Sequence, residues 1–209
     1  MSIRYEVLLV PEPSFTALAY RARQLICGQF GSWAAEMFMV HLTVADFFQC
    51  PDPAVAAVDT GLAGIAEQSR REAPQFSLSH RGVATFPDES GTVVLDFNHP
   101  QKPLALHTLH TGVIDLLQRT PGVVPELRFA LGEYSPHLTL MQYGNLPPAV
   151  FADALEFAGA MVEGLRLPAA TRAWRLLLAR FQSEAAGDDW GGGRWAADLR
   201  WEVTSSYGL

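Results

Sequence analysis

Hydrophobic residues change their spacing along this chain, and the change predicts alternating helices and strands. Apolar residues at helical spacing lie in residues 14–29, 51–71, 103–119 and 148–163. Strand-like apolar runs lie in residues 4–10, 37–48, 76–84, 92–97, 136–143, 174–182 and 194–203. Helices interspersed with antiparallel strands favour an α+β fold in which the sheets are backed by helices.

Residues that cap helices or form turns support several of these boundaries. Ser14 suits the N-cap of the first helix, and Pro51-Asp52-Pro53 suits the start of the second. Residues 87–91 predict a hairpin turn between two strands. Residues 184–193 predict a loop that is too polar and too rich in glycine to pack.

The tripeptide His-Leu-Thr occurs twice, as His41-Leu42-Thr43 and as His137-Leu138-Thr139, each inside a predicted strand. Residues two apart in a strand point to the same face. Each histidine should therefore lie beside its threonine, while the leucine between them points into the opposite layer. Each motif is expected to present an imidazole next to a hydroxyl.

The segments around the two motifs are also alike, since residues 39–44 and 135–140 share the same alternation. This likeness predicts two pseudo-symmetric lobes, each an antiparallel sheet backed by helices, with one motif per lobe and an active-site cleft between them. We expect residues 1–209 to form a single bilobed domain. The symmetry would bring two histidines and two threonines to that cleft.

A single His-Leu-Thr in a strand is more often structural than catalytic. Threonine suits strands, and one backbone carbonyl can satisfy a histidine. Two copies in matching contexts reverse that balance and favour a catalytic site.

Two imidazoles suit a particular kind of chemistry. Histidine acts as acid or base near neutral pH, so a pair can remove a proton on one side of a phosphorus and donate one on the other. Opening a 2′,3′-cyclic phosphate requires that pairing. His41 and His137 would be the catalytic acid and base in an order left open, and Thr43 and Thr139 would bind the non-bridging phosphate oxygens of the substrate. Such a reaction requires no metal or other cofactor.

The chain resembles the 2H phosphoesterases, which are named for two His-x-Thr motifs, and within them the RNA 2′,3′-cyclic phosphodiesterase or 2′-5′ RNA ligase-like group. The order of strand, helix and motif-bearing strand at the start, and a tryptophan-bearing strand pair at the end, extend the resemblance over most of the chain. The resemblance implies a bilobed fold, a cyclic phosphodiesterase activity and, in reverse, the joining of RNA ends through a 2′-5′ linkage.

The sequence departs from the family after the second motif. Enzymes of this group often carry an arginine a few residues beyond it, suited to a bidentate grip on phosphate, where this chain has Gln142. The arginines that could replace it are Arg81, Arg128, Arg175 and Arg180. The aromatic residues that could stack on a base are Phe47, Tyr134 and Tyr143, although core positions are the commoner interpretation.

Composition narrows the class of partner. A chain of 209 residues with 49% hydrophobic content can bury a core, and its net charge of −7 disfavours long duplex nucleic acid. An RNA end or a small nucleotide carrying a cyclic phosphate fits better. No apolar run is long enough to span a membrane, and no signal peptide is evident, so we expect a cytoplasmic protein, as a monomer.

A metal site is not expected. Cys27 and Cys50 form no CxxC pair, and His107 and His110, three apart on a predicted helix, have no carboxylate at the matching turn. A solvated helix face is the preferred interpretation for these two histidines.

Other function classes stay open at this stage. One alternative is a 2H enzyme of different specificity, such as a 2′-5′ phosphodiesterase or a cyclic ADP-ribose phosphate hydrolase. Another is a non-catalytic nucleotide-binding module of the same fold, which would have no need of two intact motifs.

Overall fold

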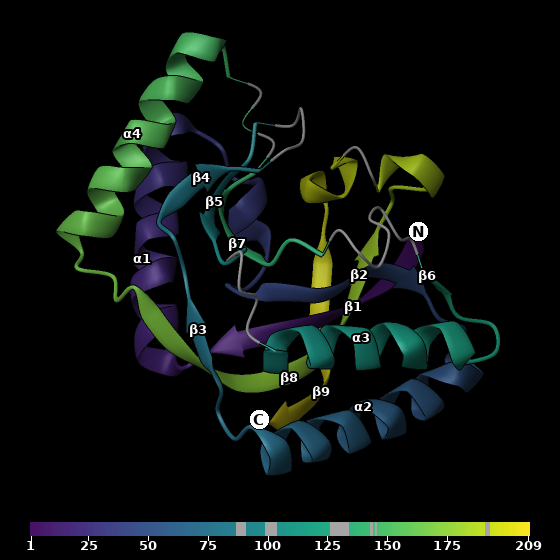
Figure 1. The fold of residues 1–209 in the computed structure, drawn as a ribbon. Coiled ribbons are helices and arrows are strands. Elements are labelled where there is room, and N and C mark those ends of the chain that lie inside the picture. Colours follow the sequence, from purple (N-terminus) through teal and green to yellow (C-terminus); the bar gives the residue numbers. More distant parts are fainter. Residues whose placement is uncertain (87–90, 99–103, 126–133, 143, 145, 191–192) are drawn as a thin grey trace.

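The computed structural model describes residues 1–86, 91–98, 104–125, 134–142, 144, 146–190 and 193–209 (Figure 1). Its α-helices are α1 (Pro13–Phe30), α2 (Asp52–Glu72), α3 (Leu104–Arg119) and α4 (Pro148–Gly164). Its strands are β1 (Ser2–Pro11), β2 (Leu42–Gln49), β3 (Ser77–Ser79), β4 (Val83–Thr85), β5 (Val93–Asp96), β6 (Val124–Pro125), β7 (His137–Met141), β8 (Ala170–Ser183) and β9 (Arg200–Gly208). The described residues also form three short 3₁₀ helices, η1 (Ala34–Met37), η2 (Gly187–Asp189) and η3 (Arg194–Ala197).

The strands form two antiparallel sheets of unequal size. The larger sheet has six strands in the order β3-β8-β1-β2-β6, with β9 also pairing with β8, and the smaller sheet has the order β4-β5-β7. The first motif lies at the start of β2 and the second in β7, so each sheet carries one. The predicted α+β fold with two antiparallel sheets is confirmed.

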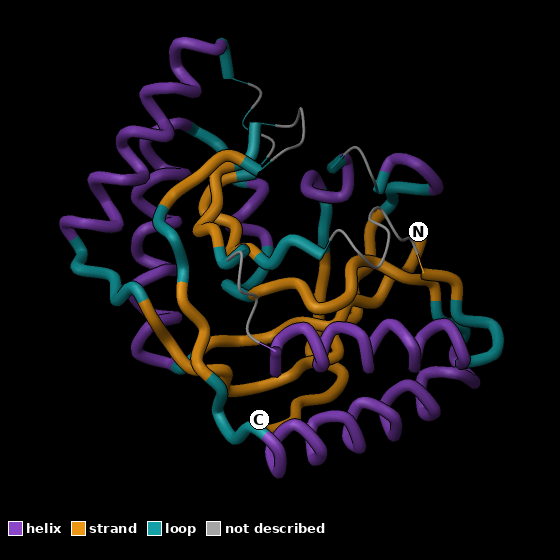
Figure 2. Tube along the Cα trace, viewed as in Figure 1, coloured by secondary structure: helices purple, strands orange, loops and turns teal. Residues whose placement is uncertain are grey.

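Each sheet has its own pair of helices, as Figures 1 and 2 show. Helices α1 and α4 lie side by side and contact β7 and β4 of the smaller sheet. Helices α2 and α3 pack together beside the larger sheet, where α3 contacts β2 and α2 contacts β9. The main hydrophobic core fills the space between these helices and the two sheets.

Helix α1 illustrates how the sequence produces these layers. Pro13 occupies its first turn, and Gly31 ends it in the left-handed conformation with φ of 66°, which glycine adopts without a steric penalty. Between these ends, Phe15, Ala19 and Ile26 form a buried stripe at helical spacing. Arg23 lies on the same buried stripe, a position that an apolar residue would normally take.

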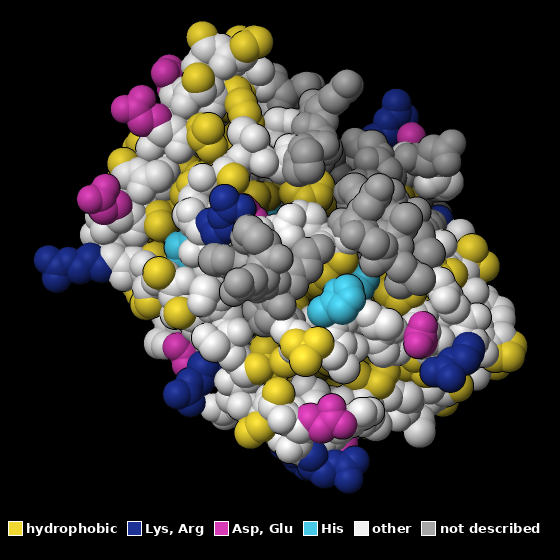
Figure 3. Space-filling view, viewed as in Figure 1, with side chains coloured by type: hydrophobic (Ala, Val, Ile, Leu, Met, Phe, Trp, Pro, Cys, Tyr) yellow, Lys and Arg dark blue, Asp and Glu magenta, His cyan; other side chains and the backbone are white. Residues whose placement is uncertain are grey.

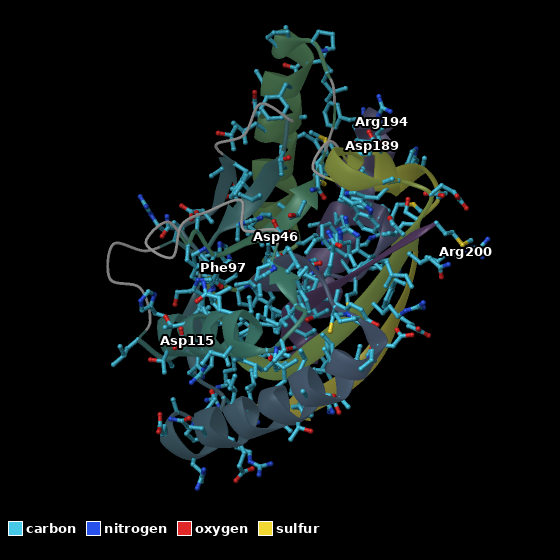
Figure 4. All side chains as sticks on the ribbon, turned by 90° about the vertical axis from the view of Figure 1, so that its right-hand side faces the viewer. Asp46, Phe97, Asp115, Asp189, Arg194 and Arg200 are labelled. Carbon is cyan, nitrogen blue, oxygen red and sulfur yellow. The ribbon has the colours of Figure 1, made fainter. Side chains whose placement is uncertain are left out.

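The opposite face of the larger sheet is covered by the chain between β8 and β9. Trp190 and Trp195 are almost fully buried there against Phe47 and Phe181. Figure 4 shows Asp189 and Arg194 beside each other on this segment, where they form an ion pair of 3.3 Å. The expectation that residues 184–193 cannot pack is therefore wrong, because tryptophan supplies enough apolar area to anchor a polar loop.

Three predicted strand boundaries are also wrong. Residues 37–41 precede β2 instead of belonging to it, and residues 194–197 form η3 before β9 begins. The predicted strand over residues 76–84 is divided between the two sheets, as β3 and β4. The chain turns between them at Gly82, where φ is 101°. Residues 87–90 of the predicted turn lie outside the described residues.

Candidate active site

The first motif begins immediately before β2. The His41 imidazole is only 6% exposed, with Nδ1 2.9 Å from the Met39 carbonyl oxygen and Nε2 3.3 Å from the Thr43 hydroxyl. Because a carbonyl can only accept a hydrogen bond, Nδ1 carries a proton and Nε2 faces the hydroxyl. Leu42 is fully buried in the main core, as the alternation predicted.

A carboxylate from β1 joins this motif. The Thr43 hydroxyl donates to Glu6 Oε1 at 2.8 Å, and the same oxygen lies 3.6 Å from His41 Nε2. Glu6 is 4% exposed, and no described residue hydrogen-bonds its other oxygen, Oε2. The first motif is therefore a chain of carboxylate, hydroxyl and imidazole.

The second motif repeats the anchoring of the imidazole with different neighbours. His137 Nδ1 lies 2.9 Å from the Ser135 carbonyl oxygen, and the ring packs against Phe86 with centroids 4.2 Å apart. Leu138 is fully buried, while His137 and Thr139 are half-buried. Among the described residues, none is recorded as hydrogen-bonding the Thr139 hydroxyl.

Tyr134 and His110 connect the chain before the second motif to the first motif's strand. The Tyr134 hydroxyl donates to the Thr43 carbonyl at 3.0 Å, and His110 Nδ1 lies 2.7 Å from the Val44 carbonyl. The two rings stack with centroids 3.8 Å apart. Burial raises the pKa of Tyr134, which keeps the hydroxyl proton in place for this contact. His110 is buried, so the predicted solvated face is wrong at this position.

Arg23 makes a second connection between the motifs, from the buried face of α1. Its Nε and Nη2 donate to the Thr139 carbonyl at 3.1 and 2.8 Å. Its Nη1 donates to the carbonyls of Ala35 and Phe38 at 2.7 and 2.9 Å, just before His41. Burial lowers the pKa of the guanidinium to about 10. Arg23 thus joins β7 to the segment that leads into the first motif.

The four arginines considered for phosphate binding have different positions. Arg81 lies 3.8 Å from Asp96, which is the strand partner of His137 in the β5–β7 pairing. Arg175 packs over Trp174 and donates to Ser206. Arg180 pairs with Glu202, and Arg128 lies outside the described residues. Of the described candidates, Arg81 is the one beside a motif.

The aromatic residues considered for base stacking also lie in different parts of the structure. Phe47 is buried in the cluster around Trp190 and Trp195, so it belongs to the core. Tyr134 is already stacked on His110, and Tyr143 lies outside the described residues. No base platform follows from these positions.

A cavity of about 610 Å³ lies behind the segment that leads into His41. Its lining includes Tyr20, Glu36, Phe38, Trp174 and Trp201, and neither motif histidine is part of it. We therefore place the candidate site at the motifs and not in this cavity.

The described residues also bear on two other kinds of site, a metal centre and a membrane-spanning helix. Among the described residues, no group of three or more His, Cys, Asp or Glu side chains is placed to hold a metal ion. No helix in the described part of the chain is long and apolar enough to cross a membrane. On the face in Figure 3, Lys and Arg side chains are scattered and do not form one patch.

Sequence reasoning missed Glu6 and Arg23. Both had a local signal: Glu6 follows Arg4 on one face of an otherwise apolar strand, and Arg23 falls on the apolar stripe of α1. Neither signal identifies the partner, because the partners come from distant segments.

Comparisons with known proteins agree with this fold. A family model described as the 2′-5′ RNA ligase superfamily matches residues 11–183. The structure of E. coli LigT complexed with 3′-AMP covers 100% of this chain and 99% of its own, with a TM-score of 0.59 and 16% identity. A crystal structure of a phosphoesterase covers 100% and 99%, with a TM-score of 0.56 and 14% identity. E. coli LigT complexed with ATP covers 99% and 96%, with a TM-score of 0.54 and 15% identity. Among curated proteins, no relative matches.

Proposed function

Because the chain belongs to the 2′-5′ RNA ligase superfamily, we propose that it is a cyclic phosphodiesterase that opens a 2′,3′-cyclic phosphate with His41 and His137 as its acid–base pair. The observation that carries the proposal is the matched anchoring of the two imidazoles. In each motif Nδ1 lies 2.9 Å from the carbonyl two residues earlier, which fixes the ring and assigns proton transfer to Nε2.

The reaction that these groups support is an in-line displacement at phosphorus. One imidazole takes a proton from water as the water oxygen bonds to phosphorus. The other imidazole gives a proton to the ribose oxygen whose bond to phosphorus breaks. Holding water, phosphorus and leaving oxygen in line converts the attack into an intramolecular step. With an RNA 5′-hydroxyl in place of water, the same displacement would break the bond from phosphorus to the 3′-oxygen, which takes up a proton, and form a 2′-5′ linkage.

During this displacement negative charge develops on the non-bridging phosphate oxygens, and hydrogen-bond donors are needed to stabilise it. The Thr139 hydroxyl is available because no described residue is recorded as its partner, and such a donor is worth most where negative charge develops. Arg81 lies 3.8 Å from Asp96, the strand partner of His137, and is a partly exposed cation on the side of the second motif. We therefore expect the substrate phosphate to bind beside the second motif.

The substrate is best sought among RNA ends and small nucleotides. The chain carries a net charge of −7, which disfavours a long phosphate backbone. The structurally similar E. coli LigT has been crystallised with 3′-AMP, ATP and NADP⁺. A terminal cyclic phosphate presents a similar ribose and phosphate.

The proposal is tested by hydrolysis of a 2′,3′-cyclic nucleotide and of a short RNA ending in a 2′,3′-cyclic phosphate, both in excess EDTA. Wild type should be active, and His137→Ala should lose activity. His107→Ala is the matched control, because His107 is an exposed histidine on α3. Whether the product carries a 2′- or a 3′-phosphate identifies the leaving oxygen.

Either of two results would contradict the proposal. Full activity in His137→Ala would remove the two-histidine mechanism. A wild type inactive on both substrates would direct the search to 2′-5′ linked or ADP-ribose phosphate substrates, or to binding without turnover.

A further inference from the structure

Glu6 is a buried carboxylate that the reaction described above does not use. It is 4% exposed, only Oε1 has a hydrogen-bond partner, and Oε2 has none among the described residues. A buried carboxylate with an unpaired oxygen is costly to keep in a fold. Its position in the central strand β1 is therefore not explained by stability.

We propose that Glu6 is a positioning residue of the active site, which orients His41 through Thr43 and withholds the Thr43 hydroxyl from the substrate. This inference rests on the proposed cyclic phosphodiesterase activity and deepens it. It makes the two motifs unequal: the first is an orienting chain around one imidazole, and the second holds the phosphate.

The number of available protons carries the argument. A threonine hydroxyl has one proton, and Thr43 gives it to Glu6 Oε1 at 2.8 Å. The contact of 3.3 Å with His41 Nε2 can then only be a hydrogen bond that the threonine oxygen accepts, and it requires a proton on Nε2 as well as on Nδ1, which is the doubly protonated ring. Thr43 has no second proton for a phosphate oxygen.

Charge points the same way. Oε1 of Glu6 lies 3.6 Å from His41 Nε2, so a phosphate oxygen placed at Thr43 would also lie close to a buried carboxylate. Like charges in a poorly solvated site repel strongly. Thr139 instead pairs across the sheet with Val94, and Asp96, the strand partner of His137, accepts from the Asn98 backbone N–H and lies 3.8 Å from Arg81, which offsets its charge.

The backbone is irregular where these residues meet. The pairing of β1 with β2 shifts register between Tyr5 and Val7 and again between Val7 and Leu8, opposite residues 43–48, which begin at the motif's threonine. Such bulges re-aim side chains and are common beside active sites. Here they leave Glu6 and Thr43 on one face of the larger sheet, within hydrogen-bond distance.

The first test is steady-state turnover of a 2′,3′-cyclic nucleotide by Glu6→Gln. This change keeps the side-chain volume and an acceptor oxygen but removes the charge. We expect kcat to fall about 10- to 100-fold, the usual range for groups that orient a catalytic residue, with KM within about twofold. Glu36→Gln is the matched control. Glu36 also has a buried oxygen without a hydrogen-bond partner among the described residues, and neither motif contains a hydrogen-bond partner of its side chain. Its kcat should stay within about twofold of wild type.

A double-mutant cycle tests the path through Thr43. If Glu6 acts through that hydroxyl, Glu6→Gln should cost little further activity in a Thr43→Val background. The same change in a Thr139→Val background should cost as much as it does in wild type. Equal, additive losses in both backgrounds would overturn the proposal.

Thermal unfolding separates a positioning role from a structural one. Glu6→Met should melt no lower than wild type, because an apolar residue replaces a poorly satisfied buried charge. A fall in Tm of more than about 4 °C would assign Glu6 to the fold and overturn the proposal. If the wild type hydrolyses cyclic phosphates and the Glu6→Gln variant is equally active, the role proposed for Glu6 is wrong and the proposed function stands. If wild type is inactive on cyclic phosphates, the proposed function fails and this inference fails with it.

Discussion

The two His-Leu-Thr motifs have the same sequence and the same anchoring of Nδ1, yet their surroundings differ. His41 is nearly buried, and its threonine donates to the carboxylate of Glu6. His137 is half-buried beside the Phe86 ring, and no described partner is recorded for the Thr139 hydroxyl. A repeated tripeptide can therefore produce equivalent backbone geometry without equivalent chemistry, because the neighbouring strand supplies the rest of the site.

The largest expected effect comes from removing either imidazole. His41→Ala and His137→Ala should each lower kcat/KM by about 10³- to 10⁴-fold, within the range for general acid–base groups. The double variant should be little worse than the poorer single variant, because the two histidines act in one step. Stopped assays in EDTA measure this, with melting curves to confirm folding. A variant that kept a tenth of wild-type activity would contradict the assignment of that histidine to acid–base catalysis.

Removing the connection between the motifs should have the next largest effect. Arg23→Met leaves the carbonyls of Thr139, Ala35 and Phe38 without their buried donor. We expect about 2–4 kcal/mol of lost unfolding free energy, from desolvated carbonyls that stay unpaired. Arg21→Met, at an exposed position two residues earlier on α1, should change it by less than about 0.5 kcal/mol. Denaturant unfolding distinguishes them, and equal losses would assign the effect to helix charge.

Substitutions of the two threonines should differ in their effect on ligand binding. If Thr139 alone donates to phosphate, Thr139→Val should weaken binding of the product nucleotide about tenfold, the loss of one charge-assisted hydrogen bond. Thr43→Val should leave binding within about twofold and act on kcat instead. Calorimetric titration with 2′-AMP and 3′-AMP provides the measurement. Equal weakening by both variants would restore the symmetric interpretation.

The smallest expected effect concerns Arg81. Its guanidinium is 53% exposed, so solvent screens its charge, and Arg81→Ala should raise KM only about two- to fivefold. Added salt should reduce the difference from wild type. Arg175→Ala is the control, because that arginine packs over Trp174 and donates to Ser206. A KM unchanged in Arg81→Ala would leave phosphate binding to the second motif alone.

Much of the architecture was predictable because its signals are local. The spacing of apolar residues predicted all of the α-helices among the described residues, and strand alternation predicted that Leu42 and Leu138 would be buried. Errors arose where an apolar run fits two conformations. Residues 37–41 pack their side chains against the core without forming a strand, and nothing in their spacing distinguishes the two outcomes.

In the candidate site too, local features were predictable from the sequence, whereas contacts between distant segments were not. The sequence by itself predicted that each motif would present an imidazole beside a hydroxyl on one face of a strand, since alternation within a strand depends only on neighbouring residues. Only the tertiary structure decided that Glu6 meets Thr43, that Arg23 binds the Thr139 carbonyl, and that Tyr134 binds the Thr43 carbonyl. These contacts depend on strand register, bulges and the docking of α1, which join segments far apart in the chain. The inequality of the two motifs is a property of that packing.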